Sequence, residues 1–411
     1  MHILFLTDNF PPEGNAPATR TFEHAKYWIT LGHQVTIITG APNFPEGRVF
    51  DGYENNWYSK EFIEGIEVRR VKTFVTSNEG FLKRILDFLS FMVSSFFAGL
   101  FVKKPDVIVG TSPQFFTIIS GYFLAKIKRR PFVFELRDIW PASITAVGAM
   151  KDSLIIKVLE KIEMFLYKHS SRIVAVTESF KNELIERGVN EQKIGVVLNG
   201  VDLSTYKPVD SKNIELETKY ALTNKFIIGY VGTHGLAHAL DSILDAAKLI
   251  ASNDEVRFLF VGGGAAKKTI DDRINSEGLN NVISIARQPK SSMPEFWSLC
   301  DLSLISLKDT DLFKTVIPSK IFESMGMGIP LLVSMPKGEA TQIVESTHSG
   351  VIVKAEQPLE LVKAIERIYS DHSIIERMSE NAKKASKTYN RESLASAFID
   401  ELEIAIEEYL R

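Results

Sequence analysis

The chain has 411 residues, too many for one small hydrophobic core, and at ~150 residues per domain this length predicts two or three domains. Apolar residues make up 45% of the sequence and charged residues 24%, which excludes a disordered or fibrous protein. The formal net charge of -3 gives no overall bias toward nucleic acid. The single cysteine, Cys300, excludes internal disulfides and a cysteine-rich zinc site, and it favours a reducing compartment.

The N-terminal end lacks the features of a secretory signal. Its apolar run, residues 3–6, has no basic flank and is soon followed by Asp8. The longest apolar segment, residues 85–102, contains Asp87 and lies between two pairs of basic residues. Because its length is at the lower limit for a bilayer span, we interpret it as a buried or interfacial helix instead of a transmembrane one.

Short β-branched runs alternate with helical patterns in the first half of the chain. We expect strands at residues 3–7, 35–39, 68–71, 106–110, 132–136, 172–177 and 196–198, with a first helix at 18–31. These runs are almost continuously apolar, as strands buried on both faces should be. The pattern predicts a doubly wound parallel sheet, with a loop-rich insert before residue 68.

A polar stretch, residues 204–224, interrupts the alternation and is interpreted as a linker with a short helix. Strands are expected again at 226–231, 257–261, 282–285, 302–305 and 331–334, with helices at 240–252, 267–276, 294–299 and 319–325. The amphipathic tail, 391–410, has no strand after it. The sequence therefore predicts an N-terminal domain (1–203), a C-terminal domain (204–385) and a final helix (386–411) that packs back across the domain junction.

Three loops of the second half have the composition of an anion site. Glycines follow two expected strands, at 232–235 and 262–264, and Lys320 opens a helix after Pro318. Any tight turn favours glycine, so each cluster alone is as easily structural. Glu323 lies one turn after Lys320 on an otherwise apolar helix, either as a salt-bridge partner or as a carboxylate that accepts hydrogen bonds from vicinal ribose hydroxyls.

Several segments together resemble the retaining glycosyltransferases of family four, which have the GT-B fold. The segments are 318–330 (PSKIFESMGMGIP), 199–202 (NGVD) and 9–14 (NFPPEG), and the segments 134–141 (FELRDIWP) and 15–20 (NAPATR) resemble the O-antigen and capsule branch, which includes N-acetyl-L-fucosamine transferases. The resemblance covers essentially the whole chain. It implies an α/β protein with two tandem Rossmann-like domains and an interdomain cleft.

By this resemblance Glu323 binds the donor ribose as the second glutamate of an E-x7-E motif, and Lys320 contacts the diphosphate. Thr315 stands where the first glutamate of the motif is expected, and Thr233 replaces the family's arginine after Gly232. Other positive groups must then hold the diphosphate. The expected donor-binding residues are Gly14, Arg20, His234, Gly263, Arg287, Thr315, Ser319, Lys320 and Glu323.

Arg137 and Asp138 close an expected strand of the first domain. They are either an ion pair that fixes the loop or a catalytic pair in which Asp138 orients the acceptor hydroxyl and Arg137 supports it. Glu339, just after another strand, is expected to touch the donor sugar and is grouped with them as catalytic. No metal-ligand spacing is apparent, so metal-independent transfer without a cofactor is expected.

Residues 81–137 contain nine basic and three acidic residues. Ordinary domain helices with solvated ends explain this composition, and so does binding to an anionic lipid surface. With a lipid-linked acceptor, as the resemblance implies, we expect a cytoplasmic protein that is peripheral at the inner face of the plasma membrane and does not bind nucleic acid.

The sequence thus predicts a glycosyltransferase that moves a sugar from a UDP-sugar, such as UDP-N-acetyl-L-fucosamine, to a lipid-linked saccharide with retention, in O-antigen or capsular polysaccharide biosynthesis. Two alternatives stay open: a UDP-sugar 2-epimerase of similar fold, and a non-catalytic member that only binds the nucleotide sugar.

Overall fold

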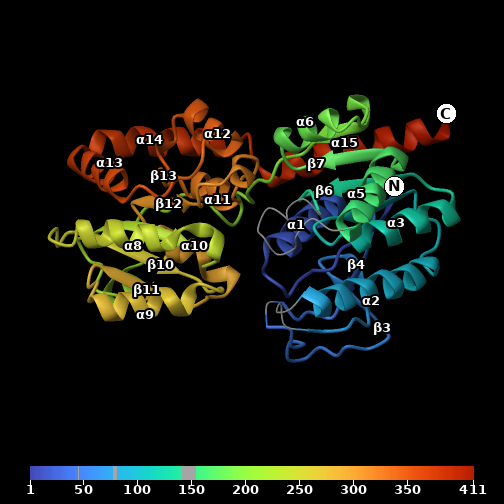
Figure 1. The fold of residues 1–411 in the computed structure, drawn as a ribbon, viewed down its shortest axis with the longest axis horizontal. Helices are drawn as coiled ribbons and strands as arrows, with labels where there is room; N and C mark the ends of the chain where they lie inside the picture. Colours follow the sequence, from blue (N-terminus) through green and yellow to red (C-terminus); the bar gives the residue numbers. More distant parts are fainter. Residues whose placement is uncertain (45, 77–80, 141–153) are drawn as a thin grey trace. The chain divides into compact units, whose positions relative to one another are not determined.

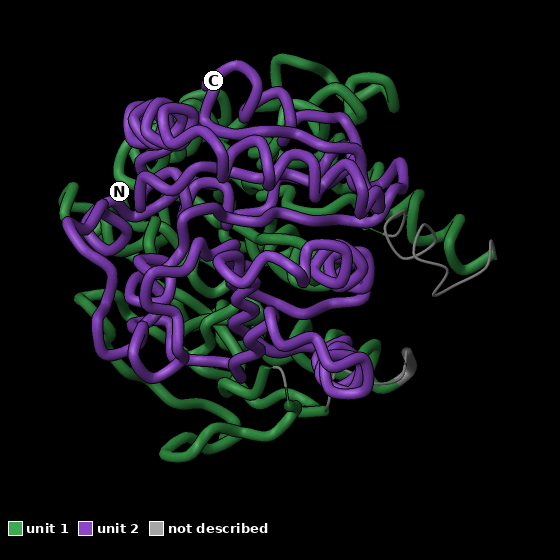
Figure 2. The backbone as a smooth tube through the Cα atoms, turned by 90° about the vertical axis from the view of Figure 1, so that its left-hand side faces the viewer, with its two compact units in different colours: residues 1–198, 391–411 green, residues 199–390 purple. Residues whose placement is uncertain are grey.

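The computed structural model describes residues 1–44, 46–76, 81–140 and 154–411. The chain forms two compact units (Figure 2): unit 1 comprises residues 1–198 and 391–411, and unit 2 comprises residues 199–390. The chain therefore passes from unit 1 to unit 2 after residue 198 and returns after residue 390. The last residue of the 134–141 segment, Pro141, lies outside the described residues.

Unit 1 contains an eight-stranded sheet in the order β3-β4-β2-β1-β5-β6-β7-β8 (Figure 1). Neighbouring strands are parallel except for β3 and β4, which are antiparallel. The strands are β1 (His2–Leu6), β2 (Gln34–Gly40), β3 (Tyr58–Ile63), β4 (Ile66–Val71), β5 (Val107–Thr111), β6 (Phe132–Leu136), β7 (Arg172–Ala175) and β8 (Ile194–Val196).

Helices cover both faces of this sheet. One face carries α2 (Phe81–Leu100), α3 (Phe115–Lys128), α5 (Leu154–His169) and α6 (Glu178–Glu186), and the other carries α1 (Ala16–Thr30) and α15 (Arg391–Leu410). Alternate residues of β1 face opposite sides of the sheet. Leu4 packs in the hydrophobic core under α2, α3, α5 and α6, and Ile3 packs in the core under α1 and α15. α1 begins after Asn15, whose side chain accepts a hydrogen bond from the Ala18 amide.

Unit 2 contains a six-stranded parallel sheet in the order β11-β10-β9-β12-β13-β14. The strands are β9 (Phe226–Val231), β10 (Val256–Val261), β11 (Val282–Ile285), β12 (Leu302–Ser306), β13 (Leu331–Ser334) and β14 (Gly350–Val353). The helices are α7 (Ile214–Lys219), α8 (Leu240–Leu249), α9 (Lys267–Glu277), α10 (Met293–Ser298), α11 (Lys320–Met327), α12 (Glu339–Thr347), α13 (Pro358–Ser370) and α14 (His372–Ser386).

The structure confirms the α/β class and the two Rossmann-like sheets. It also contains two strands that the sequence patterns did not indicate. β3 lies at a sheet edge and has no buried position, so it lacks an apolar run, and β14 has only four residues and begins with Gly350. Helix α15 belongs to unit 1, where it packs against α1 and β7. None of the helices in the described part of the chain is long and apolar enough to cross a bilayer.

Candidate active site

The carboxyl ends of β9 and β10 lie side by side in unit 2, and each leads into a glycine-rich loop. A Cβ added at Gly262, which has φ +151°, would lie 1.8 Å from the carbonyl oxygen of Gly232. One at Gly264, which has φ +147°, would lie 2.6 Å from the His234 carbonyl oxygen. These loops approach too closely for any side chain, so the glycines are structurally required. Parallel sheets bind ligands at this edge.

Lys320 is buried beside these loops without a hydrogen-bonding partner among the described residues. It is the first residue of α11 and is 9% exposed, and its Nζ lies 3.7 Å from the centre of the Tyr230 ring. Burial lowers the pKa of Lys320 to about 7, although the Glu323 carboxylate opposes this shift. A buried ammonium without hydrogen bonds is costly to the fold. An anionic ligand at the start of α11 would therefore supply the partner that Lys320 Nζ lacks among the described residues.

His234 adds a second unsatisfied polar side chain at the same place. It is fully buried, neither ring nitrogen has a hydrogen-bond partner among the described residues, and its backbone amide donates to the Gly263 carbonyl. Burial, together with the charges of Lys267 and Lys320, lowers the pKa of His234 to about 4. The ring is therefore neutral near pH 7 and retains one N–H that can donate to a ligand.

His238 was not among the residues expected at the site. It ends a short 3-10 helix (Leu236–His238), its Nδ1 lies 3.2 Å from the Gly235 amide, and its ring centre lies 6.0 Å from that of Tyr230. Burial and the nearby Lys320 charge lower the pKa of His238 to about 4. A single histidine after Ala237 carries no recognisable spacing, so sequence patterns did not indicate it as a site residue.

The remaining expected donor residues of unit 2 lie on the loops that follow the next strands. Arg287, after β11, is exposed, and its Cβ lies 3.5 Å from the position of a Cβ on Gly263. Thr315 follows the short helix Asp311–Lys314, and its hydroxyl donates to the Leu312 carbonyl, so this hydroxyl holds its own loop. Ser319 is the N-cap residue of α11 and makes no side-chain cap bond.

Glu339 and Glu323 lie at the starts of neighbouring helices. Glu339 is the first residue of α12, directly after Gly338, where a Cβ would lie 1.9 Å from the Lys314 carbonyl oxygen. This contact brings the loop after β13 against the loop that carries Thr315. Glu323 lies in the first turn of α11, half-buried, close enough for its charge to oppose the lowered pKa of Lys320.

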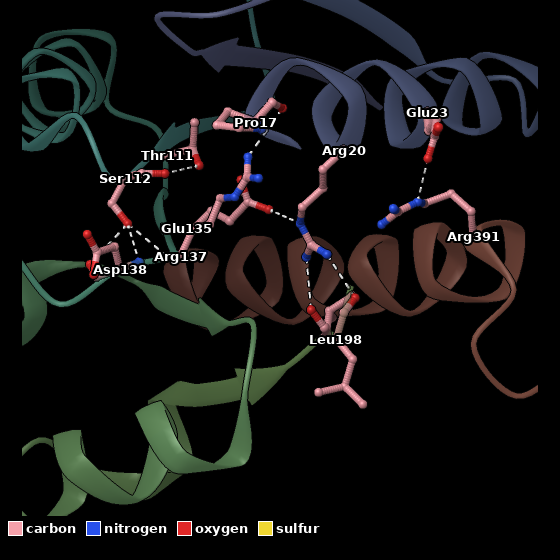
Figure 3. A network of polar contacts seen from close by, with 11 residues as sticks. Pro17, Arg20, Glu23, Thr111, Ser112, Glu135, Arg137, Asp138, Leu198 and Arg391 are labelled. Carbon is pink, nitrogen blue, oxygen red and sulfur yellow. Dashed lines mark hydrogen bonds and ion pairs between the residues drawn. The ribbon is translucent and has the colours of Figure 1, made fainter. Parts of the chain in front are cut away.

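In unit 1, Arg137 and Asp138 follow β6 and are half-buried (Figure 3). The Ser112 hydroxyl, at the end of neighbouring β5, accepts hydrogen bonds from the Arg137 amide at 2.8 Å and from the Asp138 amide at 3.2 Å. Arg137 Nη1 donates to the Pro17 carbonyl at the start of α1, at 3.3 Å. The backbone that carries Asp138 is thus held by β5 and α1.

Arg20 lies in the interior of unit 1, with 1% of the residue exposed. Its Nε donates to the Glu135 carboxylate at 2.8 Å, and its two terminal nitrogens donate to the carbonyls of Leu198 and Val197 at 2.8 and 2.9 Å. Gly14, in the loop before α1, is exposed. The structure thus gives Arg20 three partners inside unit 1 and leaves Gly14 at the surface.

The structure therefore brings the expected residues together in two groups, one in each unit. His234, Gly263, Arg287, Ser319, Lys320 and Glu323 lie at one sheet edge of unit 2 with the loops of Thr315 and Glu339, and Arg20, Arg137 and Asp138 lie in one polar network of unit 1. Within the described residues, no group of three or more histidine, cysteine or acidic side chains is placed to hold a metal ion.

Two protein-family models match the chain, one in each half. The model described as "Glycosyltransferase Family 4" matches residues 18–205, and the model described as "Glycosyl transferases group 1" matches residues 213–385. WcaI of Escherichia coli (strain K12), which is named for glycosyl transfer in colanic acid biosynthesis, is 25% identical and covers 98% of this chain and 100% of its own length. The capsular polysaccharide biosynthesis glycosyltransferase CapM of Staphylococcus aureus is 22% identical, with 87% of this chain and 90% of CapM covered.

Solved structures share the fold over nearly the whole chain. Sucrose-phosphate synthase from Thermosynechococcus elongatus superposes with a TM-score of 0.77 at 14% identity, and 97% of each chain is covered. Anabaena HepE in complex with UDP-glucose superposes with a TM-score of 0.73 at 19% identity, with 98% of this chain and 99% of HepE covered. The two family models and these structural matches together define a glycosyltransferase of the GT-B fold. The chain belongs to glycosyltransferase family 4, and its second half is of the group 1 type.

Proposed function

We propose that this glycosyltransferase takes its sugar from a UDP-sugar bound at the β9, β10 and α11 edge of unit 2. The observation that carries the proposal is the buried Nζ of Lys320, which has no hydrogen-bonding partner among the described residues and lies beside two loops that only glycine can form. A diphosphate supplies the missing negative charge and approaches such loops without steric conflict. The solved structures of HepE with UDP and with UDP-glucose support the choice of nucleotide.

The other residues of this edge then have distinct roles. The Glu323 carboxylate accepts hydrogen bonds from the ribose hydroxyls, and the amides of the first turn of α11 face the phosphates together with Ser319. Arg287 and neutral His234 supply further donors to the diphosphate, in place of the arginine that family members carry after Gly232. Glu339 is assigned to the donor sugar.

The acceptor is assigned to unit 1, where Asp138 orients the attacking hydroxyl and Arg137 supports the charge that develops. In the reaction, the bond between the anomeric carbon and the diphosphate oxygen breaks, and a bond to the acceptor oxygen forms on the same face. The acceptor proton passes to the departing diphosphate, so that configuration is retained and UDP is released. The enzyme needs no metal for this assignment, because protein cations and helix amides face the phosphates.

The donor is further assigned as a UDP-activated N-acetylated sugar such as UDP-N-acetyl-L-fucosamine, and the acceptor as a lipid-linked saccharide of O-antigen or capsule synthesis. A panel of UDP-, GDP- and TDP-sugars, tested by thermal shift, checks the nucleotide, because a ligand that binds only the folded protein raises its melting temperature. We expect only UDP compounds to stabilise the protein, and Glu323→Ala to weaken UDP binding about tenfold in calorimetry, with Glu345→Ala as the control. Unchanged affinity in Glu323→Ala would remove the ribose assignment.

Donor binding is expected to depend on pH through Lys320. In the protein without donor, the pKa of Lys320 is about 7. A bound diphosphate raises this pKa, so above about pH 7 the binding of UDP is accompanied by the uptake of a proton. UDP affinity should fall roughly tenfold per pH unit above about pH 7, with close to one proton taken up per UDP at about pH 8. His234 and His238, whose pKa values lie at about 4, stay neutral throughout this range.

Calorimetry in buffers of different ionisation enthalpy measures this proton uptake directly. Lys320→Met should bind UDP weakly and without proton uptake, since the titrating group is gone. Proton uptake that persists in this variant would assign the effect to another group.

Peripheral membrane binding is proposed for the α2 and α3 face of unit 1. Exposed apolar side chains recur at helical spacing on this face, and exposed cations lie at the helix ends. The apolar residues are Leu86, Val93, Phe97, Phe101, Phe123 and Ile127, and the cations are Lys83, Arg84, Lys103, Lys104, Lys126 and Arg129. Two further cations of this region form hydrogen bonds within unit 1. Lys128 donates to the Leu100 carbonyl, and Arg137 donates to the Pro17 carbonyl. Basic residues near an anionic leaflet contribute about 1 kcal/mol each.

This assignment predicts that the protein pellets with vesicles of phosphatidylcholine and phosphatidylglycerol at low salt and is released as the salt concentration rises. Lys103→Glu with Lys104→Glu, and separately Phe97→Ser with Phe101→Ser, should reduce the pelleted fraction at least tenfold. Leu249→Ser with Leu359→Ser removes two other exposed apolar residues, in unit 2, and this variant should pellet like the wild type. A wild-type protein that stays in the supernatant at low salt would contradict the assignment.

A further inference from the structure

The two segments by which the chain passes between the units are anchored to the same helix of unit 1. The chain leaves unit 1 after Leu198 and re-enters it at Arg391. Just inside unit 2 the two segments run side by side, because Val201 forms a parallel bridge with Asn390 and its amide donates to the Tyr389 carbonyl. We call residues 197–201 the first crossing segment and residues 389–391 the second crossing segment.

Helix α1 holds both crossing segments within unit 1 (Figure 3). Arg20 donates to the carbonyls of Val197 and Leu198, the last two residues before the first crossing. One turn further along α1, the Glu23 carboxylate accepts a hydrogen bond at 2.8 Å from Nε of Arg391, the first residue after the second crossing. Two charged side chains on adjacent turns thus hold the two points at which the chain connects the units.

The Arg20 guanidinium also contacts β6, the strand that leads to the proposed acceptor residues. Nε of Arg20 pairs with Glu135, which is fully buried on β6, two residues before Arg137 and three before Asp138. Each of the three nitrogen atoms of the Arg20 guanidinium therefore donates to a partner within unit 1. The planar fork fixes the geometry of all three partners at once, which lysine cannot do.

The surroundings of this network keep its charges in place. His24, one turn after Arg20, is buried against the rings of Trp28 and Phe398. Burial lowers the pKa of His24 well below its usual range, and the positive charges of Arg20, Arg391 and Arg137 add to this effect. The histidine is therefore neutral and adds no further charge to this network. The Arg20–Glu135 pair is fully buried, so this ion pair is weakly screened and depends on correct geometry.

We propose that Arg20 is a positioning residue for sugar transfer and not a donor contact: it ties the Asp138 end of β6 to the first crossing segment, while Glu23 and Arg391 hold the second. This inference rests on the proposed function, because it takes Asp138 as the residue that orients the acceptor. It separates Arg20 from UDP binding, which is assigned entirely to unit 2. Arg20 then affects turnover without contacting either substrate.

The test compares UDP affinity with turnover in folded variants. Arg20→Met alone leaves Glu135 as an unpaired buried charge, so the double variant Arg20→Met with Glu135→Gln removes both charges and preserves the volume. We expect it to bind UDP within about twofold of the wild type in calorimetry, while kcat falls by at least tenfold and the KM for the donor is nearly unchanged. Arg20→Lys, which keeps the charge but loses the fork, should show the same separation with a smaller fall in kcat.

Hydrogen exchange supplies a second measurement that does not require activity. In the double variant the amides of residues 136–138 and 197–201 should exchange faster together, whereas Glu23→Gln should accelerate exchange only near residue 391. A raised Kd for UDP with normal kcat would instead make Arg20 a donor contact, and a normal kcat in the folded double variant would remove the positioning role. Failure of the wild type to bind UDP would count against the proposed function itself. The exchange result would then still test whether Arg20 holds the end of β6 and the first crossing segment together.

Discussion

Lys320→Met is expected to raise the stability of the free protein and to abolish most of its affinity for UDP. The Nζ of Lys320 is buried without hydrogen bonds to any described residue, and its pKa of about 7 lies far below that of lysine in an unfolded chain. Methionine has a similar shape and no charge, so it removes the desolvation cost. A gain of about 2 kcal/mol is expected from this change. In a domain of this size such a gain raises the melting temperature by roughly 5 °C.

The stabilisation should itself depend on pH. Because the folded pKa of Lys320 is depressed, the unfolded chain binds the extra proton between about pH 7 and 10, and the wild type becomes more stable as the pH rises through this range. The advantage of Lys320→Met is therefore largest below about pH 7 and fades toward about pH 10. Thermal denaturation at several pH values measures this trend, and an advantage that does not change with pH would contradict it.

Affinity is expected to change in the opposite direction. In the proposed function the Lys320 ammonium makes a charge-assisted contact to the diphosphate, so its loss should weaken UDP binding about 100-fold, equivalent to ~2.7 kcal/mol. Lys268→Met is the matched control, because this lysine follows the Gly262 to Gly264 loop but is exposed and paired with Asp272. A Lys320→Met protein that binds UDP like the wild type would place the diphosphate elsewhere.

Asp138→Asn is expected to reduce kcat by about 100-fold or more while UDP affinity stays unchanged. The substitution keeps the size of the side chain and the backbone bonds to Ser112, so the end of β6 should keep its geometry. It removes the negative charge that is assigned to orient the acceptor hydroxyl, and such groups contribute roughly 10²–10⁴-fold to rate. The proposed donor site lies in unit 2, so UDP affinity should not respond to this substitution.

The measurement is the release of UDP in the presence of acceptor, together with calorimetry of UDP alone. Asp51→Asn, an exposed carboxylate of unit 1, serves as the control. Turnover close to that of the wild type in Asp138→Asn would leave only the alternative in which Arg137 and Asp138 fix the loop. Loss of both turnover and UDP affinity would indicate an effect of the substitution on folding.

Much of the fold follows from local patterns. Strands such as β6, β9 and β13 are buried on both faces, so most of their positions are apolar and the runs are visible in the sequence. β3 could not be seen in this way. It is an edge strand whose side chains are exposed or half-buried, and only its pairing with β4 defines it.

The candidate site was predictable where function demands a special residue type. Gly262 and Gly264 must lack side chains, and Lys320 and Glu323 lie in the segment 318–330, which carries the resemblance to the family. His238 has no such signal, because its place beside Tyr230 and Lys320 depends on how the loop after β9 turns.

The sequence by itself therefore determined the class of fold, the family and the positions of the glycine loops, since these depend on periodicity and on residue types with few alternatives. Only the tertiary structure decided what each charge faces. Arg20 and Lys320 are both buried cations, but Arg20 is fully paired with Glu135 and two carbonyls, whereas the Lys320 ammonium meets an aromatic ring and no hydrogen-bonding partner in the described chain. The partners of Arg20 and the ring beside Lys320 come from segments far away in the sequence, and no local pattern records such contacts.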